Sequence, residues 1–191
     1  RASRNAIVSA NDITGTCTHI AYVRNGNIGE IFINGISEGT HVIQYNITAN
    51  HVVSFGQEYD TRNRTSQHFK GNMWDIAIWN TSRTAAQIQS DADGNLTGEE
   101  LGLVAYYDCN QGSPNQSNPT ENVLRDATSN NFDLPLNGFA LNGDNSNWVS
   151  DECATVFDND IFKAIIVNNQ FTNVQDALYL RGKEVIFDGN N

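Results

Sequence analysis

The chain has 191 residues, 39% of them hydrophobic, which is enough apolar material for the core of at least one domain. The formal net charge is −11, with 11 lysines and arginines against 22 acidic residues. A nucleic-acid partner requires a basic stripe, and none is visible, so we expect no nucleic-acid binding. No stretch reaches the roughly 18 apolar residues of a membrane helix, so we expect no membrane span in this segment.

The first predicted elements form a β-hairpin. Residues 20–23 are apolar on both faces, as in a strand that is covered on both sides. Asn25-Gly26-Asn27 is a strong turn signal, and residues 31–33 form the return strand. We therefore expect buried side chains at Ile20, Tyr22, Ile31 and Ile33.

Further strands and one helix follow. Alternation over residues 43–47 and the apolar run at 51–56 predict two strands, whereas the polar stretch 57–67 has no periodicity and predicts a surface loop. Residues 69–80 predict another strand. Thr84 and Gln87 have capping-box spacing, which predicts a short helix after it.

The second half begins with a buried strand at residues 102–108 and an exposed loop at 110–122. The last strands of the domain are expected at 132–141 and 147–149. The many strands and tight turns predict an all-β, antiparallel β-sandwich with one short helix.

Composition changes near residue 153. Beyond it, Ile161, Phe162, Ile165 and Ile166 have helical spacing, and residues 177–189 are typical of a new strand pair. We therefore expect one domain over residues 1–152 and the start of a following module over 153–191, which is either a second β-sandwich or a repeat cap.

The acidic residues do not form a catalytic pair along the predicted strands. A glycosidase needs two carboxylates about 5 to 9 Å apart, which on a strand means acids two residues apart. Asp75 has Met73 and Ala77 as its same-face neighbours, and no G-x-S-x-G nucleophile elbow is present. We therefore expect no enzymatic activity.

One stretch resembles the opening of a calcium-binding loop. Asp91, Asp93 and Asn95 have the spacing of the first ligands of an EF-hand. The similarity ends at Leu96 and Gly102, where the EF-hand has a glycine and a bidentate glutamate. The alternatives are a Ca²⁺ site at the three residues and an ordinary turn after the helix.

The chain has three cysteines, Cys17, Cys109 and Cys153, without the spacing of a zinc site. Cys109 ends a predicted strand and Cys153 follows the last strand of the same domain, so we predict a disulfide between them. Cys17 would then be buried, or paired with a part of the protein outside this chain.

Three stretches together resemble laminin G-like domains of the concanavalin A-like lectin/glucanase superfamily. CTHIAYVRNGNIGEIFING resembles the family's W-x-H-I-A and Y-I-N-G hairpin, with Cys17 in place of the tryptophan. FKGNMWDIAIWNTSRTAAQI is similar to its D-[DE]-[VI]-x-I-[WY]-N strand and following helix, with Ile76 in place of the second acid. GLVAYYDCNQG and LRDATSNNFDLPLNGF resemble its closing strand and D-x-[ST]-x-N segment. These matches span residues 16–150.

The resemblance implies a jelly-roll sandwich, of which this chain would hold the C-terminal part. It also implies a non-catalytic module of a large secreted or cell-surface protein, with a glycan or protein ligand and other modules of the same chain as partners. The alternatives are a structural spacer in a long adhesin or filament and an accessory domain of a glycoside hydrolase.

If the module binds glycan, we expect the contact surface on loops at a sandwich rim. The candidates lie in the polar stretch before Phe69: Tyr59, Arg62, Asn63, Arg64 and His68. Tyr59 would stack on a sugar ring, and the arginines would donate paired hydrogen bonds to hydroxyl or acidic groups. The alternative is an ordinary solvated loop.

Overall fold

The computed structural model describes residue 13 and residues 17–43, 54–61, 64–66, 68–69, 71–93, 96–142, 148–150, 161–167, 178–181 and 184–187. The elements in chain order are β1 (Cys17–Asn25), β2 (Ile28–Ile33), β3 (Ile36–Val42), β4 (Glu58–Thr61), β5 (Arg64–Ser66), β6 (Asn72–Trp79), α1 (Ala85–Ala92), β7 (Leu103–Tyr107), β8 (Val123–Leu124), β9 (Leu134–Pro135), β10 (Ile161–Val167), β11 (Leu178–Arg181) and β12 (Glu184–Phe187). The predicted all-β fold class with one short helix is confirmed for this part of the chain.

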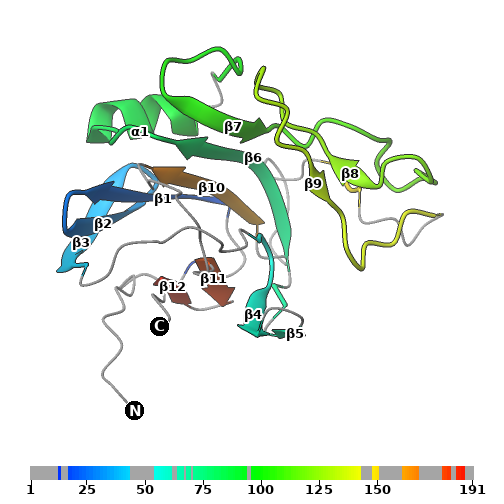
Figure 1. Cartoon of the computed structure of the whole chain (residues 1–191), viewed down its shortest axis with the longest axis horizontal. Helices are drawn as coiled ribbons and strands as arrows, with labels where there is room; N and C mark the ends of the chain where they lie inside the picture. The colour runs from blue at the N-terminus through cyan, green and yellow to red at the C-terminus, as the bar shows by residue number, and fades with distance from the viewer. Residues whose placement is uncertain are drawn as a thin grey trace.

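A six-stranded sheet organises the fold, in the order β3-β2-β1-β10-β6-β7 (Figure 1). The hairpin partners β1–β2, β2–β3 and β6–β7 are antiparallel. Strand β10 lies between β1 and β6 and runs parallel to both. Three two-stranded sheets, β4–β5, β8–β9 and β11–β12, complete the described strands.

The β1–β2 hairpin forms as its sequence predicts. Ile20 pairs with Ile33 and Tyr22 with Ile31, and all four side chains are buried. The carboxamide of Asn34, a residue with φ +49°, accepts a hydrogen bond from the backbone amide of His19 at 2.9 Å. The end of the hairpin is therefore fastened back to its first strand.

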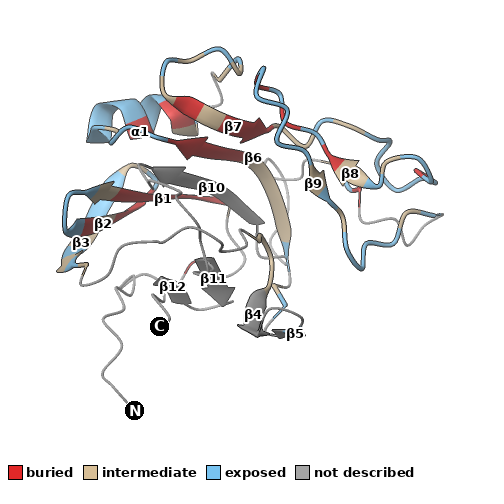
Figure 2. Cartoon of the chain, viewed as in Figure 1, coloured by how far each residue is buried: buried red, intermediate tan, exposed pale blue. Residues whose placement is uncertain are grey.

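Both faces of this sheet are covered. On one face, Ala21 and Val23 of β1 pack in one cluster with Trp79 and with Ile88 of α1. On the other face, Ile20 and its neighbours pack with Ile13, Ile43 and Phe69. A third cluster lies under β6 and β7 and includes Trp148. Figure 2 shows most of β1 and β7 and the second half of β6 in the colour of buried residues.

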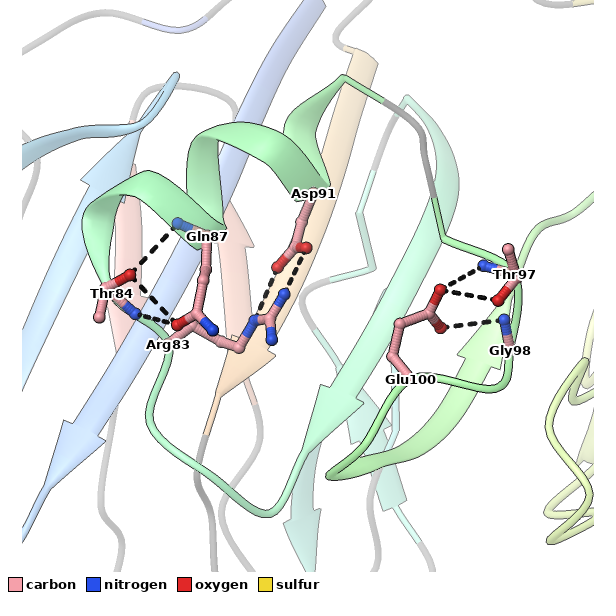
Figure 3. A network of polar contacts seen from close by, with 7 residues as sticks. All are labelled: Arg83, Thr84, Gln87, Asp91, Thr97, Gly98 and Glu100. Atoms are coloured by element: carbon pink, nitrogen blue, oxygen red, sulfur yellow. Dashed lines mark hydrogen bonds and ion pairs between the residues drawn. The ribbon is translucent and has the colours of Figure 1, made fainter.

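Helix α1 begins as the capping box predicts. The Thr84 hydroxyl accepts from the Gln87 amide at 3.3 Å, and the Gln87 side chain accepts from the Thr84 amide at 2.9 Å (Figure 3). These bonds satisfy amides that lack partners inside the helix. Ile88 then points into the core with no exposed surface, which fixes the helix on the sheet.

Four sequence predictions of secondary structure are wrong. Residues 58–61 and 64–66 pair as strands β4 and β5 where a loop was expected over 57–67, because Tyr and Thr favour strands. Residues 161–167 form strand β10, although their apolar residues have helical spacing. The chain is extended here because it pairs with β1 on one side and β6 on the other, and because β-branched isoleucines favour strands. Residues 148–150 contain no strand, and neither do residues 54–56 of the run at 51–56. The rest of the strands predicted at 43–47 and 51–56 falls outside the described residues.

The C-terminal segment was expected to begin a following module at residue 153. Within it, β10 joins the six-stranded sheet, whereas β11 and β12 form the predicted strand pair. The boundary itself, and the division into residues 1–152 and 153–191, remain predictions.

Because Gly29 has no side chain, the rings of Tyr22 and His41 can approach each other beside its Cα. Gly29 pairs with His41, whose Nε2 lies 3.5 Å from the Tyr22 hydroxyl. A Cβ at position 29 would lie 2.3 Å from that hydroxyl oxygen and 2.5 Å from Cε1 of His41. We expect Gly29→Ala to lower the free energy of unfolding by about 1 to 3 kcal/mol in denaturant titrations. Gly26→Asn is the control, because nothing lies within 4 Å of a Cβ there and asparagine tolerates its φ of +62°; equal losses in both variants would contradict the steric explanation.

Candidate functional site

Two of the five residues predicted to contact a ligand, Tyr59 and Arg64, lie on the β4–β5 hairpin, below the lower end of β6 in Figure 1. Tyr59 of β4 pairs with Thr65 of β5, and Thr61 pairs with Arg64. Arg64 is exposed, and so is His68 just after the hairpin. Arg62 and Asn63 lie outside the described residues. The structure thus places Tyr59 and Arg64 on paired strands, where the sequence predicted an irregular loop.

The hairpin and the residues that follow it differ in charge. Residues 58–66 contain Glu58 and Asp60 as well as Arg62 and Arg64, for a formal charge of 0, whereas residues 61–70 contain Arg62, Arg64 and Lys70 and no Asp or Glu, for a formal charge of +3 in a chain of net charge −11. Guanidinium groups donate paired hydrogen bonds to carboxylate and sulfate oxygens and to hydroxyls. The segment is therefore suited to polar or anionic ligands.

One of the three predicted calcium ligands, Asp91, has another partner in the described part of the chain. Asp91 is buried, and its two oxygens accept hydrogen bonds from Arg83 at 2.6 and 2.9 Å (Figure 3). Arg83 also lies over the Trp79 ring, 3.8 Å from its centroid. Asp93 is the C-cap of α1, and Asn95 lies outside the described residues. This geometry gives Asp91 a structural role, and a Ca²⁺ site here remains an untested expectation.

The polar centre that sequence reasoning missed is Asp126. One carboxylate oxygen accepts from the backbone amides of Tyr106 (3.0 Å) and Thr128 (2.9 Å), and the other accepts from the Thr128 hydroxyl and the Phe132 amide, both at 2.9 Å. Burial alone would raise the pKa of Asp126, but these hydrogen bonds together lower it. The D-x-T pattern could have indicated the local bonds, although not the one to Tyr106, twenty residues away.

Segment 126–130 closes the outer edge of β7. The amide of Ala127 donates to the Tyr106 carbonyl at 2.7 Å, and the Asn130 side chain donates to the Val104 carbonyl at 2.9 Å. A covered edge does not offer free backbone groups for pairing with another strand. The family-like D-x-[ST]-x-N segment therefore acts as a structural clamp on the sheet.

Two non-glycine residues in the left-handed region meet where β6 and β7 lie side by side. Asp75 has φ +52° and Cys109 has φ +58°. An oxygen of Asp75 accepts a hydrogen bond from the Tyr106 hydroxyl at 2.5 Å.

The thiol of Cys109 is a poor nucleophile at neutral pH. Its burial, and to a smaller extent the negative charge of Asp108, raise its pKa to about 12.

The predicted disulfide between Cys109 and Cys153 is wrong. Cys109 is a free thiol, and it donates a hydrogen bond to the Tyr107 carbonyl at 3.6 Å. It packs with the cluster under β6 and β7, which turns it toward the core. Cys17 is disulfide-bonded, and Cys153 lies outside the described residues.

Glu100 also has its carboxylate occupied by hydrogen bonds within the fold. It accepts from the amide and hydroxyl of Thr97 at 2.7 and 2.8 Å and from the Gly98 amide at 3.1 Å (Figure 3). Within the described ranges, no group of three or more His, Cys, Asp or Glu side chains is arranged to hold a metal ion. No helix in that part of the chain is long and apolar enough to cross a bilayer.

Residues 1–89 match the family model described as the concanavalin A-like lectin/glucanases superfamily. Neither a curated protein nor a solved structure matches the chain. The β1–β2 hairpin, β6 and α1 up to residue 89 lie inside the matched range, whereas β7 and the Asp126 segment lie beyond it. Domains of this kind are typically non-catalytic modules that bind carbohydrate or protein, and they are commonly extracellular. Residues 1–89 are therefore similar to the concanavalin A-like lectin/glucanase superfamily, which is consistent with a partial laminin G-like domain.

Proposed function

We propose that this chain is a non-catalytic adhesion module that binds a glycan or protein ligand at the cell surface, within a secreted or surface protein of several modules. The superfamily assignment of residues 1–89 is the observation that carries the proposal. The carboxylates of Asp91, Asp126 and Glu100 support it, because each is occupied by bonds that hold the fold.

The disulfide at Cys17 supports an extracellular location. Disulfides persist in oxidising compartments and are rare where glutathione keeps thiols reduced. The excess of acidic residues agrees with a soluble, well-hydrated surface away from the hairpin.

The proposed contact surface is the β4–β5 hairpin with its flanks. Arg62 and Arg64 would hold hydroxyl, carboxylate or sulfate oxygens through paired hydrogen bonds. Tyr59 would supply a ring face for a sugar, with Asn63 and His68 as further polar contacts. Glu58 and Asp60 of β4 offset part of the +3 charge of residues 61–70, which leaves +1 over residues 58–70; this charge favours acidic sugars over neutral ones through attraction that salt weakens.

We expect wild-type protein to bind members of an array of neutral, uronate-containing and sulfated glycans. Tyr59→Ala and Arg64→Gln are each expected to raise the Kd for the most tightly bound glycan about tenfold or more, which corresponds to a loss of about 1.4 kcal/mol of binding free energy. Arg125→Gln is the matched control, because the Arg125 side chain is 59% exposed and belongs to a different part of the fold.

The same titration separates the alternatives. If wild type and both hairpin variants bind one glycan equally well, the hairpin is not the site. If wild type binds no glycan and no protein ligand, the chain is a spacer in a longer protein and the proposed binding function is wrong.

A further inference from the structure

We infer that His41 is a pH-sensitive latch, which holds the edge strand β3 on the main sheet and releases it when the protein is acidified. Strand β3 is the end strand of the six-stranded sheet, and among the described strands it pairs only with β2. None of its residues is fully buried, and none belongs to the three core clusters. The strand therefore depends on its backbone pairing and on the few side chains that reach inward.

The side chain of His41 reaches across β2 to β1. His41 lies opposite Gly29 of β2, which on its other side lies opposite Arg24 of β1. The imidazole extends over Gly29 to Tyr22, so that the two ring centroids are 5.9 Å apart and Nε2 of His41 lies 3.5 Å from the Tyr22 hydroxyl. Tyr22 is buried in the core. This contact therefore connects the edge strand to the centre of the sheet.

The surroundings of the His41 ring suit the neutral imidazole. Its Nδ1 atom is buried, and none of the described residues forms a hydrogen bond with it. An imidazolium ion carries a proton on both ring nitrogens, so protonation would leave a buried N–H and a positive charge without a partner. Burial accordingly lowers the pKa of His41.

The charged and titratable groups around His41, in the described part of the chain, do not compensate for that positive charge. On β1, burial raises the pKa of Tyr22 to about 12, so its hydroxyl stays neutral, and Arg24 is a second positive charge close enough to act on Tyr22. Glu30 of β2 is next to Gly29 in the strand, and Glu38 of β3 is three residues from His41. Because side chains alternate along a strand, both carboxylates project from the opposite face of the sheet.

The pairing of β3 is therefore linked to pH. The pKa of His41 is lower with β3 in place than in a detached strand, where it takes the ordinary value of about 6.5. The contact is at full strength above about pH 6.5 and weakens as the pH falls through the lower value of the folded chain. Release of β3 would expose the backbone groups at the outer edge of β2, which can pair with another strand.

Amide hydrogen exchange of the full chain tests the latch. Rates are measured at about pH 7.5 and about pH 5.5 and divided by the intrinsic rate of an unstructured amide at the same pH. We expect the protection of β3 amides to fall several-fold at the lower pH, by at most about tenfold per pH unit because one proton is involved. The amides of β7, at the other end of the sheet, should keep their protection. Unchanged protection of β3, or an equal loss in β7, would overturn the inference.

The variant His41→Phe keeps a ring beside Tyr22 and removes the titrating nitrogens. We expect its β3 amides to have the same protection at both pH values. His68→Gln is the matched control, because His68 is exposed and lies outside the main sheet, and it should keep the wild-type pH dependence. If His41→Phe loses protection on acidification as wild type does, His41 is not the latch.

If His41→Phe does not fold, an NMR titration of the His41 ring in wild-type protein decides. We expect its midpoint below the value of about 6.5 of an unperturbed histidine, and a midpoint at or above that value would overturn the inference.

Discussion

Replacing Asp126 with alanine is expected to lower the free energy of unfolding by about 3 to 5 kcal/mol. The substitution removes the acceptor of four hydrogen bonds, three of them from backbone amides, at a residue that is only 8% exposed. Asp126 and Thr128 are both buried, so most of the loss comes from polar groups that are left without an acceptor. Denaturant titration of purified variants measures the effect.

Asp133→Ala is the matched control for this prediction. Asp133 is exposed and accepts a single bond, at 2.9 Å from the Asp126 amide, so we expect a loss of about 1 kcal/mol. Equal losses at the two positions would show that Asp126 is not the centre of the segment.

The stability of the protein at acidic pH should depend on the ionisation of Asp126. The pKa of Asp126 is lower in the folded chain than in the unfolded chain, so its charged form stabilises the fold. That contribution is present above the ordinary carboxyl pKa of about 3.9 and is lost as the pH falls through the lower, folded value. In Asp126→Asn the free energy of unfolding should therefore fall less steeply as the pH is lowered through the acidic range. If it falls as steeply as in wild type, Asp126 is not the carboxylate responsible.

Replacing Arg83 with alanine is expected to cost about 3 to 5 kcal/mol of stability. The change leaves the carboxylate of Asp91 buried without its bidentate partner and removes the cation stacked on Trp79. Unfolding titrations of Arg83→Ala, Asp91→Ala and the double variant form a cycle that isolates the pair. We expect the double variant to lose much less than the sum of the single losses, whereas additive losses would show that the two side chains act independently.

The same variants address calcium. If Asp91 serves the ion pair alone, added Ca²⁺ leaves the unfolding midpoint of wild type unchanged. A Ca²⁺-dependent rise that Asp91→Asn abolishes would instead support the calcium-site alternative.

The sequence predicted the elements whose signals are local. The Asn25-Gly26 turn and the Thr84–Gln87 capping box each depend on neighbouring residues, and both the first hairpin and α1 formed as expected. The burial of Ile31 and Ile33 followed from the same hairpin register.

The missed features depend on residues far apart in the chain. Asp126 is important because β7 brings Tyr106 beside it, and no local pattern contains that contact. Strand β10 shows the reverse case, in which isoleucines at helical spacing become a strand because two open ladders receive them. The Cys109–Cys153 prediction failed because spacing along the chain does not reveal that Cys109 turns toward the core.

The sequence predicted which residues make up the candidate site, although not their secondary structure. The basic residues around Arg64 are visible in the sequence, whereas the pairing of β4 with β5 is not, because this polar stretch has no hydrophobic periodicity. Its proposed role in binding rests on the arginines, on the exposure of Arg64 and on the similarity of residues 1–89 to the superfamily.

The most direct test of the central claim measures binding and cleavage together. The glycan that binds most strongly on the array is incubated with the full chain at saturating concentration, and new reducing ends are quantified over time beside the amount of bound glycan. We predict saturable binding that Arg64→Gln weakens, with no reducing ends above the protein-free control. Reducing ends that accumulate with protein concentration would contradict the account and identify the chain as part of a glycoside hydrolase.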